Sequence, residues 1–84
     1  MCRNITELRG LQPAATPAEV EAAARQYVRK VSGLRVPPAP AAGAFEAAIQ
    51  QVAEATTRLL ADLPPRRQPP QSEPPLRRIA ARGG

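Results

Sequence analysis

Cys2 has the greatest capacity for covalent chemistry in this sequence of 84 residues. If Met1 is removed, the Cys2 thiol lies beside an α-amine, whose ordinary pKa of about 7.7–8.0 suits a base near neutral pH. Arg3 and a helix start at Asn4 would favour the thiolate. The sequence identifies no oxyanion donor or carboxylate partner for this thiol. The simpler interpretation is therefore that Cys2 is a small residue packed near the chain start. The alternatives are that it is a nucleophile, a redox sensor or a metal ligand in an oligomer.

The rest of the composition argues against an enzyme. Cys2 is the only cysteine, and the chain has no histidine. Without an imidazole, Ser-His-Asp and Cys-His catalysis have no base, and zinc sites of Cys and His ligands cannot form within one chain. We therefore expect no catalytic residue other than Cys2 as a candidate nucleophile, no metal site and no cofactor.

Phosphate binding is the chemistry that the basic residues allow. The chain holds 12 Lys and Arg against 7 Asp and Glu, a net charge of +5, and most of the excess lies in residues 64–84. Phosphate contacts there would be salt-dependent and without base specificity, and no aromatic residue is available to stack on bases. A solvated tail is the simpler interpretation. The candidate nucleic-acid-binding residues are Arg66, Arg67, Arg77, Arg78 and Arg82.

A second basic group, formed by Arg29, Lys30 and Arg35, is a candidate anion-binding site. Arg29 and Lys30 fall at the end of a predicted helix, where cations complement the helix dipole. That structural role is the simpler interpretation, and contact with a phosphate or an acidic protein is the alternative.

The clearest element is a helix predicted over residues 17–32. Thr16, Pro17 and Glu19 have the spacing of a capping box with proline in the first helical position, and Gly33 is a suitable stop. Glu21 and Arg25 are spaced for an i,i+4 ion pair. The apolar stripe of this helix comprises Val20, Ala23, Ala24, Tyr27, Val28 and Val31, so Tyr27 is expected in the core.

A second helix is predicted over residues 43–63, after the proline-rich connector 33–43. Pro64 and Pro65 end it, and Glu54 and Arg58 form a second i,i+4 pair. Its apolar stripe comprises Phe45, Ala48, Ile49, Val52, Thr56, Leu59, Leu60 and Leu63.

These elements predict an all-α fold, an antiparallel two-helix hairpin with a short N-terminal helical turn over residues 5–9. Ile5, Leu8 and Leu11 are expected to cover one end of the groove between the helices, and Gly10 suits a left-handed end to the turn. Residues 1–63 form the predicted small helical domain. Residues 64–84 form a disordered Pro/Arg-rich tail, in which residues 75–80 could make one helical turn against a partner.

The predicted core is small, because alanines fill many stripe positions and bury little area. A protein partner or a homo-oligomer is therefore expected. The sequence contains neither 18 consecutive apolar residues nor an apolar segment near its start. We accordingly expect no membrane association and a cytoplasmic location.

Two stretches, Met1–Ile5 and Gln26–Gly33, resemble a family of short bacterial proteins classified as a domain of unknown function and typified by an MCRNI start. The resemblance covers residues 1–63 and implies no activity. The connector departs from the Lys/Arg-Pro-Ser type of the relatives. Gly43 also stands where relatives tend to have Asn, so the polar caps of the second helix are lost.

Three functions follow, in order of preference. The first is a non-enzymatic protein–protein interaction module. The second is a nucleic-acid or ribosome-associated protein that binds phosphates through its arginine-rich tail. The third is a thiol, redox or metal-linked role of an N-terminal Cys2.

Overall fold

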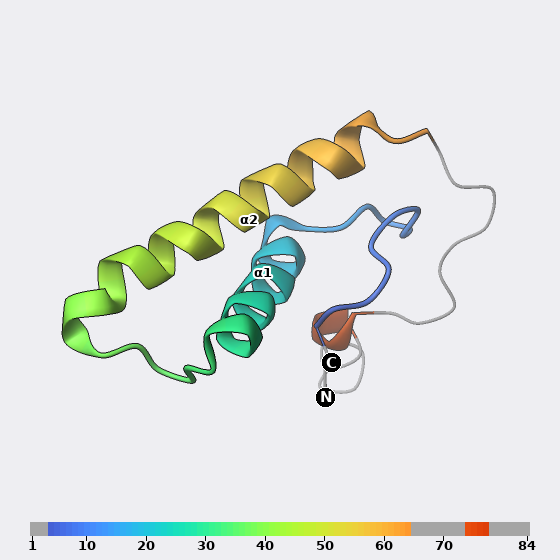
Figure 1. Ribbon diagram of the computed structural model, residues 1–84. Helices are drawn as coiled ribbons and strands as arrows, with labels where there is room; N and C mark the ends of the chain where they lie inside the picture. Colours follow the sequence, from blue (N-terminus) through green and yellow to red (C-terminus); the bar gives the residue numbers. More distant parts are fainter. Residues whose placement is uncertain (1–3, 65–73, 78–84) are drawn as a thin grey trace.

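The computed structural model describes residues 4–64 and 74–77, in which the regular elements are helices and no strand occurs. Helix α1 (Pro17–Ser32) and helix α2 (Ala42–Asp62) form a hairpin, with the 3-10 turn η1 (Ala39–Ala41) leading into α2. The predicted all-α hairpin is confirmed, and both helices fall within a residue of their expected bounds (Figure 1). Neither of the two described helices has the length and apolarity needed to cross a membrane.

Helix α1 begins and ends at the residues that its sequence signals indicate. The backbone N–H of Glu19 donates to Thr16 Oγ1 over 3.1 Å, and the N–H of Thr16 donates to Glu19 Oε1 over 2.9 Å. This reciprocal pair is the predicted capping box, and it satisfies two N–H groups that the helix start leaves open. At the other end Gly33 adopts φ 72°, a left-handed conformation that favours glycine.

Helix α2 begins without a polar cap. Its first turn continues from η1, in which the N–H of Ala41 donates to the Pro38 carbonyl over 2.9 Å, and no side chain caps α2. The proline-rich connector therefore replaces the missing cap by starting the helix from a preformed turn. At the far end Leu63 is extended and Pro64 follows, which stops the helix where diproline predicts.

The core lies between the two helices. One buried cluster joins Ala24 and Val28 of α1 to Phe45 and Ile49 of α2, and Ile49 is fully buried. A second cluster places Leu8 and Leu11 of the N-terminal segment against Val20. The predicted roles of Leu8, Leu11 and Phe45 are thereby confirmed.

The outer parts of both predicted stripes lie at the surface. Tyr27 and Val31 on α1, and Leu59 on α2, are exposed, so the prediction that Tyr27 belongs to the core is wrong. The reason is geometric, because each helix of a hairpin has only one neighbour and cannot bury a wide apolar stripe. Ile5 is likewise 43% exposed instead of covering the end of the helices.

The helical turn expected over residues 5–9 is not formed, and residues 4–16 are an irregular segment with isolated turns and bends. The N–H of Asn4 donates to Gln26 Oε1 of α1. Asn4 is therefore held by a contact 22 positions away in sequence and does not start a local helical turn. A single isolated turn gains too few hydrogen bonds to persist on its own. Gly10 does adopt the expected left-handed conformation, with φ 83°.

Arg25 fastens the two helices through an ion pair that the sequence pattern did not identify. Its guanidinium donates to both carboxylate oxygens of Glu46 over 2.8 and 2.9 Å, and also to Glu21 over 3.1 Å. The bond to Glu21 is the predicted i,i+4 pair. The second predicted pair, Glu54 with Arg58, is absent from the ion pairs among the described residues.

Candidate protein-binding surface

The N-terminal segment, residues 4–16, crosses α1 and reaches the end of α2. Its first described residue is tied to α1 by the 2.7 Å bond from the Asn4 N–H to Gln26 Oε1. Further along, Arg9 Nε and Nη2 donate to the Pro64 carbonyl oxygen over 3.2 and 3.0 Å. Between these ties Leu8 is buried. The segment thus adds a third wall beside the two helices.

A shallow apolar groove lies where this segment meets both helices. It encloses about 300 Å³, and we name it the Tyr27 groove. Two of its lining side chains are large, apolar and half exposed, with Tyr27 at 48% and Ile5 at 43%. Exposed apolar groups that gather on a hollow are typical of interaction sites. The groove is lined by Ile5, Thr6, Leu8, Ala23, Ala24, Tyr27, Val52, Thr56 and Leu60.

Thr6 gives this groove an unsatisfied polar atom. Its Oγ1 is buried and has no hydrogen-bond partner among the described residues. A buried hydroxyl without a partner costs about 1–3 kcal/mol relative to a bonded one. The position of the N-terminal segment at Thr6 therefore lowers the stability of the fold by this amount.

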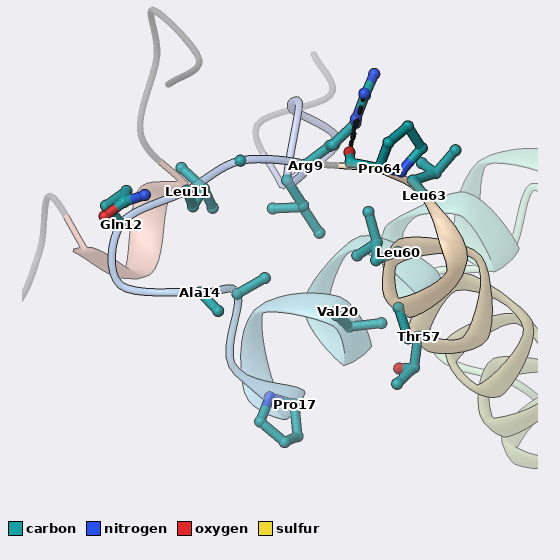
Figure 2. A pocket seen from close by; sticks show the side chains of 14 residues that line it. Arg9, Leu11, Gln12, Ala14, Pro17, Val20, Thr57, Leu60, Leu63 and Pro64 are labelled. Atoms are coloured by element: carbon teal, nitrogen blue, oxygen red, sulfur yellow. Dashed lines mark hydrogen bonds between the residues drawn. The ribbon is translucent and has the colours of Figure 1, made fainter. Parts of the chain in front are cut away.

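A second hollow continues from the Tyr27 groove on the other side of Leu8 and Leu60, which line both. We name it the Arg9 cavity, and its volume is about 380 Å³. Figure 2 shows the Arg9 side chain reaching Pro64 at the rim, with Val20, Leu60 and Thr57 below. Arg9 forms no ion pair with a described residue. Leu8 and Leu60 therefore separate two neighbouring hollows, each lined by the N-terminal segment and both helices.

Residues 74–77 close onto the start of α1 and form what we name the C-terminal latch. The N–H of Arg77 donates to the Pro74 carbonyl over 3.0 Å, which closes one helical turn. Arg77 Nε donates to Glu19 Oε2 over 2.8 Å, and Nη2 donates to Glu19 Oε1 over 3.2 Å. Nη2 also donates to the carbonyls of Pro13 and Ala14, over 2.6 and 3.0 Å. The latch therefore differs from the solvated chain expected for the whole tail.

The contact between the latch and Glu19 is buried. The Glu19 side chain is only 3% exposed and that of Arg77 15%, while Pro74 is buried. A carboxylate at that depth requires a cation, and a guanidinium offers the planar fork that matches it. Hydrogen bonds from Arg77 chiefly hold the pKa of Glu19 below its usual value, burial opposes them, and bonds from Thr16 add to the lowering.

Hydrogen bonds from an arginine also lower the pKa of a carboxylate between the two helices. Hydrogen bonds from Arg25 lower the pKa of Glu46, which is at the surface. The carboxylates of Glu46 and Glu21 in turn raise the pKa of Arg25. Arg25 and Glu46 are accordingly charged at neutral pH, and their contact fixes α1 against α2.

The structure separates the candidate site residues of the sequence into three sets. Arg29, Lys30 and Arg35 are exposed near the helix end that faces the connector. Arg77 lies in the latch, where its guanidinium is engaged by Glu19. The remaining candidates lie outside the described residues: Cys2, Arg66, Arg67, Arg78 and Arg82.

Sequence patterns did not identify several residues that build this surface. Glu19 was visible as a capping residue, yet nothing in its local pattern indicates burial against Arg77, which is 58 positions away. The hydrogen bond from Arg9 to the Pro64 carbonyl joins residues 55 positions apart, and local periodicity does not predict it either. Within the part of the chain that the structure describes, no three His, Cys, Asp or Glu side chains gather as a metal site.

Comparison with known proteins gives one family match. The family described as an uncharacterized conserved protein, DUF2277, matches residues 1–82. The match extends past Leu63, where the resemblance read from the sequence ends, and it includes the residues of the latch. Neither the curated proteins nor the solved structures contain a match to this chain.

Proposed function

We propose that this chain, which belongs to the DUF2277 family, is a protein-binding module that receives an amphipathic helix of a partner protein in the Tyr27 groove. The observation that carries the proposal is the placement of Tyr27 and Ile5, two large side chains left about half exposed on one apolar hollow. Aromatic side chains with a polar tip are frequent anchors of protein interfaces.

The shape of the groove supports a helix as its occupant. Val52, Thr56 and Leu60 follow one another at four-residue spacing along α2, and Ala23 and Tyr27 do so on α1. Such rows form the ridges between which a third helix packs. The row on α2 spans about 12 Å, room for roughly two helical turns.

The chemistry of the partner follows from the lining. Ala23 and Ala24 are small and let a helix backbone approach closely, while Leu60 and Ile5 present apolar surface. The complementary helix carries apolar residues at positions i, i+3 or i+4, and i+7, with polar residues on its other face. A third helix also extends a core in which few large side chains are buried.

Photo-crosslinking in the producing cells tests this proposal. A photoreactive phenylalanine derivative at position 27 of the full chain should form a discrete adduct that mass spectrometry maps to an amphipathic helix of another protein. Leu59 is the matched control position, because it is exposed on α2 and does not line the groove. Equal adducts from positions 27 and 59, or adducts only with a second copy of this chain, would contradict the proposal.

A second candidate function is the binding of nucleic-acid or ribosomal phosphates. Three exposed cations, Arg29, Lys30 and Arg35, gather near the connector, and none forms an ion pair with a described residue. Arg77, a further candidate for phosphate contact in the tail, donates to Glu19. Neutral variants at positions 30 and 35 should reduce RNA binding and its dependence on salt. Unchanged binding and an unchanged salt slope would reject this candidate.

A further inference from the structure

The Arg9 cavity has an apolar floor and a single cation at its rim. Its floor is formed by Leu8, Leu11 and Val20, all of them buried. Among the described residues that line the cavity, Arg9 is the only charged one. Figure 2 shows its side chain at the mouth of the hollow. A ligand that enters the cavity therefore meets apolar surface below and a guanidinium at the entrance.

The guanidinium of Arg9 keeps N–H groups that the described residues do not use. Nε and Nη2 both donate to the Pro64 carbonyl oxygen, over 3.2 and 3.0 Å. No other hydrogen bond and no ion pair joins Arg9 to the described part of the chain. The edge formed by Nη1 and the second N–H of Nη2 is therefore open, and its geometry matches the two oxygens of a carboxylate. Because Pro64 holds the guanidinium in place, little freedom is lost when an anion binds to it.

We propose that the Arg9 cavity binds a small carboxylate that has an apolar body. The carboxylate pairs with the open edge of Arg9, and the apolar body lies on Leu8, Leu11 and Val20. The net charge of +5 attracts such an anion at long range. A phosphate with two negative charges fits less well, because the described lining supplies one cation.

The volume of the cavity sets the size of this ligand. It is about 380 Å³, which lies in the range of about 300–1,000 Å³ typical of small-molecule sites. At about 30 Å³ for each non-hydrogen atom, the cavity has room for roughly a dozen such atoms. Octanoate, a straight-chain carboxylate, is of this size and serves as the probe. The site does not depend on the proposed partner helix, because Arg9 does not line the Tyr27 groove.

A structural role of Arg9 is the alternative explanation for its position. Its bonds to Pro64 join the N-terminal segment to the end of α2. That joining requires no anion, so it predicts no preference of the cavity for one charge over another. Ligands of equal length and different charge therefore distinguish the two roles.

A comparison of such ligands tests the proposal on the natural full-length chain. Octanoate, octylammonium and 1-octanol are titrated separately, and NMR spectra record the backbone amides. Octanoate should shift the amides of Leu8, Val20 and Leu60, and it should bind at least about tenfold more tightly than the other two. Acetate, which lacks the apolar body, should not shift these amides. Equal affinity for octanoate and octylammonium, shifts confined to other parts of the chain, or no binding of octanoate would overturn the proposal.

Substitution of the cation gives a second test. Arg9→Ala should weaken octanoate binding at least about tenfold. Arg58→Ala is the matched control, because Arg58 is an exposed arginine that does not line the Arg9 cavity, and it should leave the affinity unchanged. Circular dichroism checks that both variants keep their helices, and the comparison of ligands on the natural chain decides alone if Arg9→Ala does not. Unchanged affinity in a folded Arg9→Ala chain, or an equal loss in Arg58→Ala, would overturn the proposal.

Discussion

Arg77 donates to both carboxylate oxygens of Glu19, and this contact ties the fourth residue of the latch to the third residue of α1. Glu19 serves the helix twice, because the carboxylate that receives Arg77 also accepts the backbone N–H of Thr16. Loss of Arg77 thus has two effects. It removes the buried partner of Glu19, and it loosens the cap that Glu19 forms with Thr16. The family match to residue 82 agrees with a latch that belongs to the domain.

Replacing Arg77 should destabilise the fold. Arg77→Ala leaves the buried Glu19 carboxylate without a cation, and we expect a loss of about 2–3 kcal/mol in the free energy of unfolding. Urea unfolding followed by circular dichroism at neutral pH measures the loss. Arg58→Ala is the matched control, since Arg58 is exposed and forms no ion pair with a described residue. Equal, small effects of both substitutions would count against the latch.

Acid should weaken the fold through the same carboxylate. The folded-state pKa of Glu19 lies below the ordinary value of about 4.3, so at intermediate pH the unfolded chain binds more protons than the folded one. The stabilisation is complete above the ordinary pKa and is lost as pH falls through the lowered one. Glu46 contributes in the same direction through Arg25. Glu19→Gln should flatten the decline of stability between neutral pH and about pH 3, and an unchanged slope would contradict this assignment.

Removing the hydroxyl of Thr6 should stabilise the protein. Thr6→Val keeps the shape of the side chain and removes a buried oxygen that has no partner among the described residues. We expect a gain of about 1 kcal/mol in the free energy of unfolding. Thr57→Val is the control, because Thr57 is exposed and has no such penalty to relieve. A loss of stability in Thr6→Val would show that the hydroxyl has a partner in solution.

Two glycines should respond with opposite signs to alanine. Gly33 has φ 72°, where a Cβ is strained although it meets nothing within 4 Å, so Gly33→Ala should cost about 1 kcal/mol. Gly43 lies in the first turn of α2, and an added Cβ there also meets nothing within 4 Å. Gly43→Ala should raise stability by about 0.5 kcal/mol, because alanine is the better helix former. Thermal melts of both variants measure the change in melting temperature. Changes of the same sign in the two variants would refute the explanation from backbone conformation.

The two helices could be predicted from sequence because their signals are local. The capping box of Thr16 and Glu19, the stop at Gly33 and the prolines after Leu63 all act within one helical turn. Those signals set both bounds of α1 and the end of α2 to within a residue. The core residues Phe45 and Ile49 likewise follow from helical spacing alone.

The candidate surface could not be predicted in the same way. Periodicity assigns Tyr27 to an apolar stripe, yet whether a stripe is covered depends on how many neighbours the helix has. The N-terminal segment takes its path from Asn4 bonding to Gln26 and from Arg9 bonding to Pro64, contacts that no local pattern encodes. Arg77 illustrates the same limit, because its ion pair with Glu19 joins residues 58 positions apart, which no local pattern indicates.

The affinity of the partner helix for matched variants tests the proposed function most directly. Once the partner is identified by crosslinking at position 27, its helix is titrated against the natural chain, Tyr27→Ala and Leu59→Ala, with both variants checked for natural helical content. The Tyr27 groove predicts a loss of at least about tenfold for Tyr27→Ala, as for an interface anchor, and less than about twofold for Leu59→Ala, which lies outside the groove. Equal affinity of all three chains would contradict the assignment of this groove as the protein-binding surface.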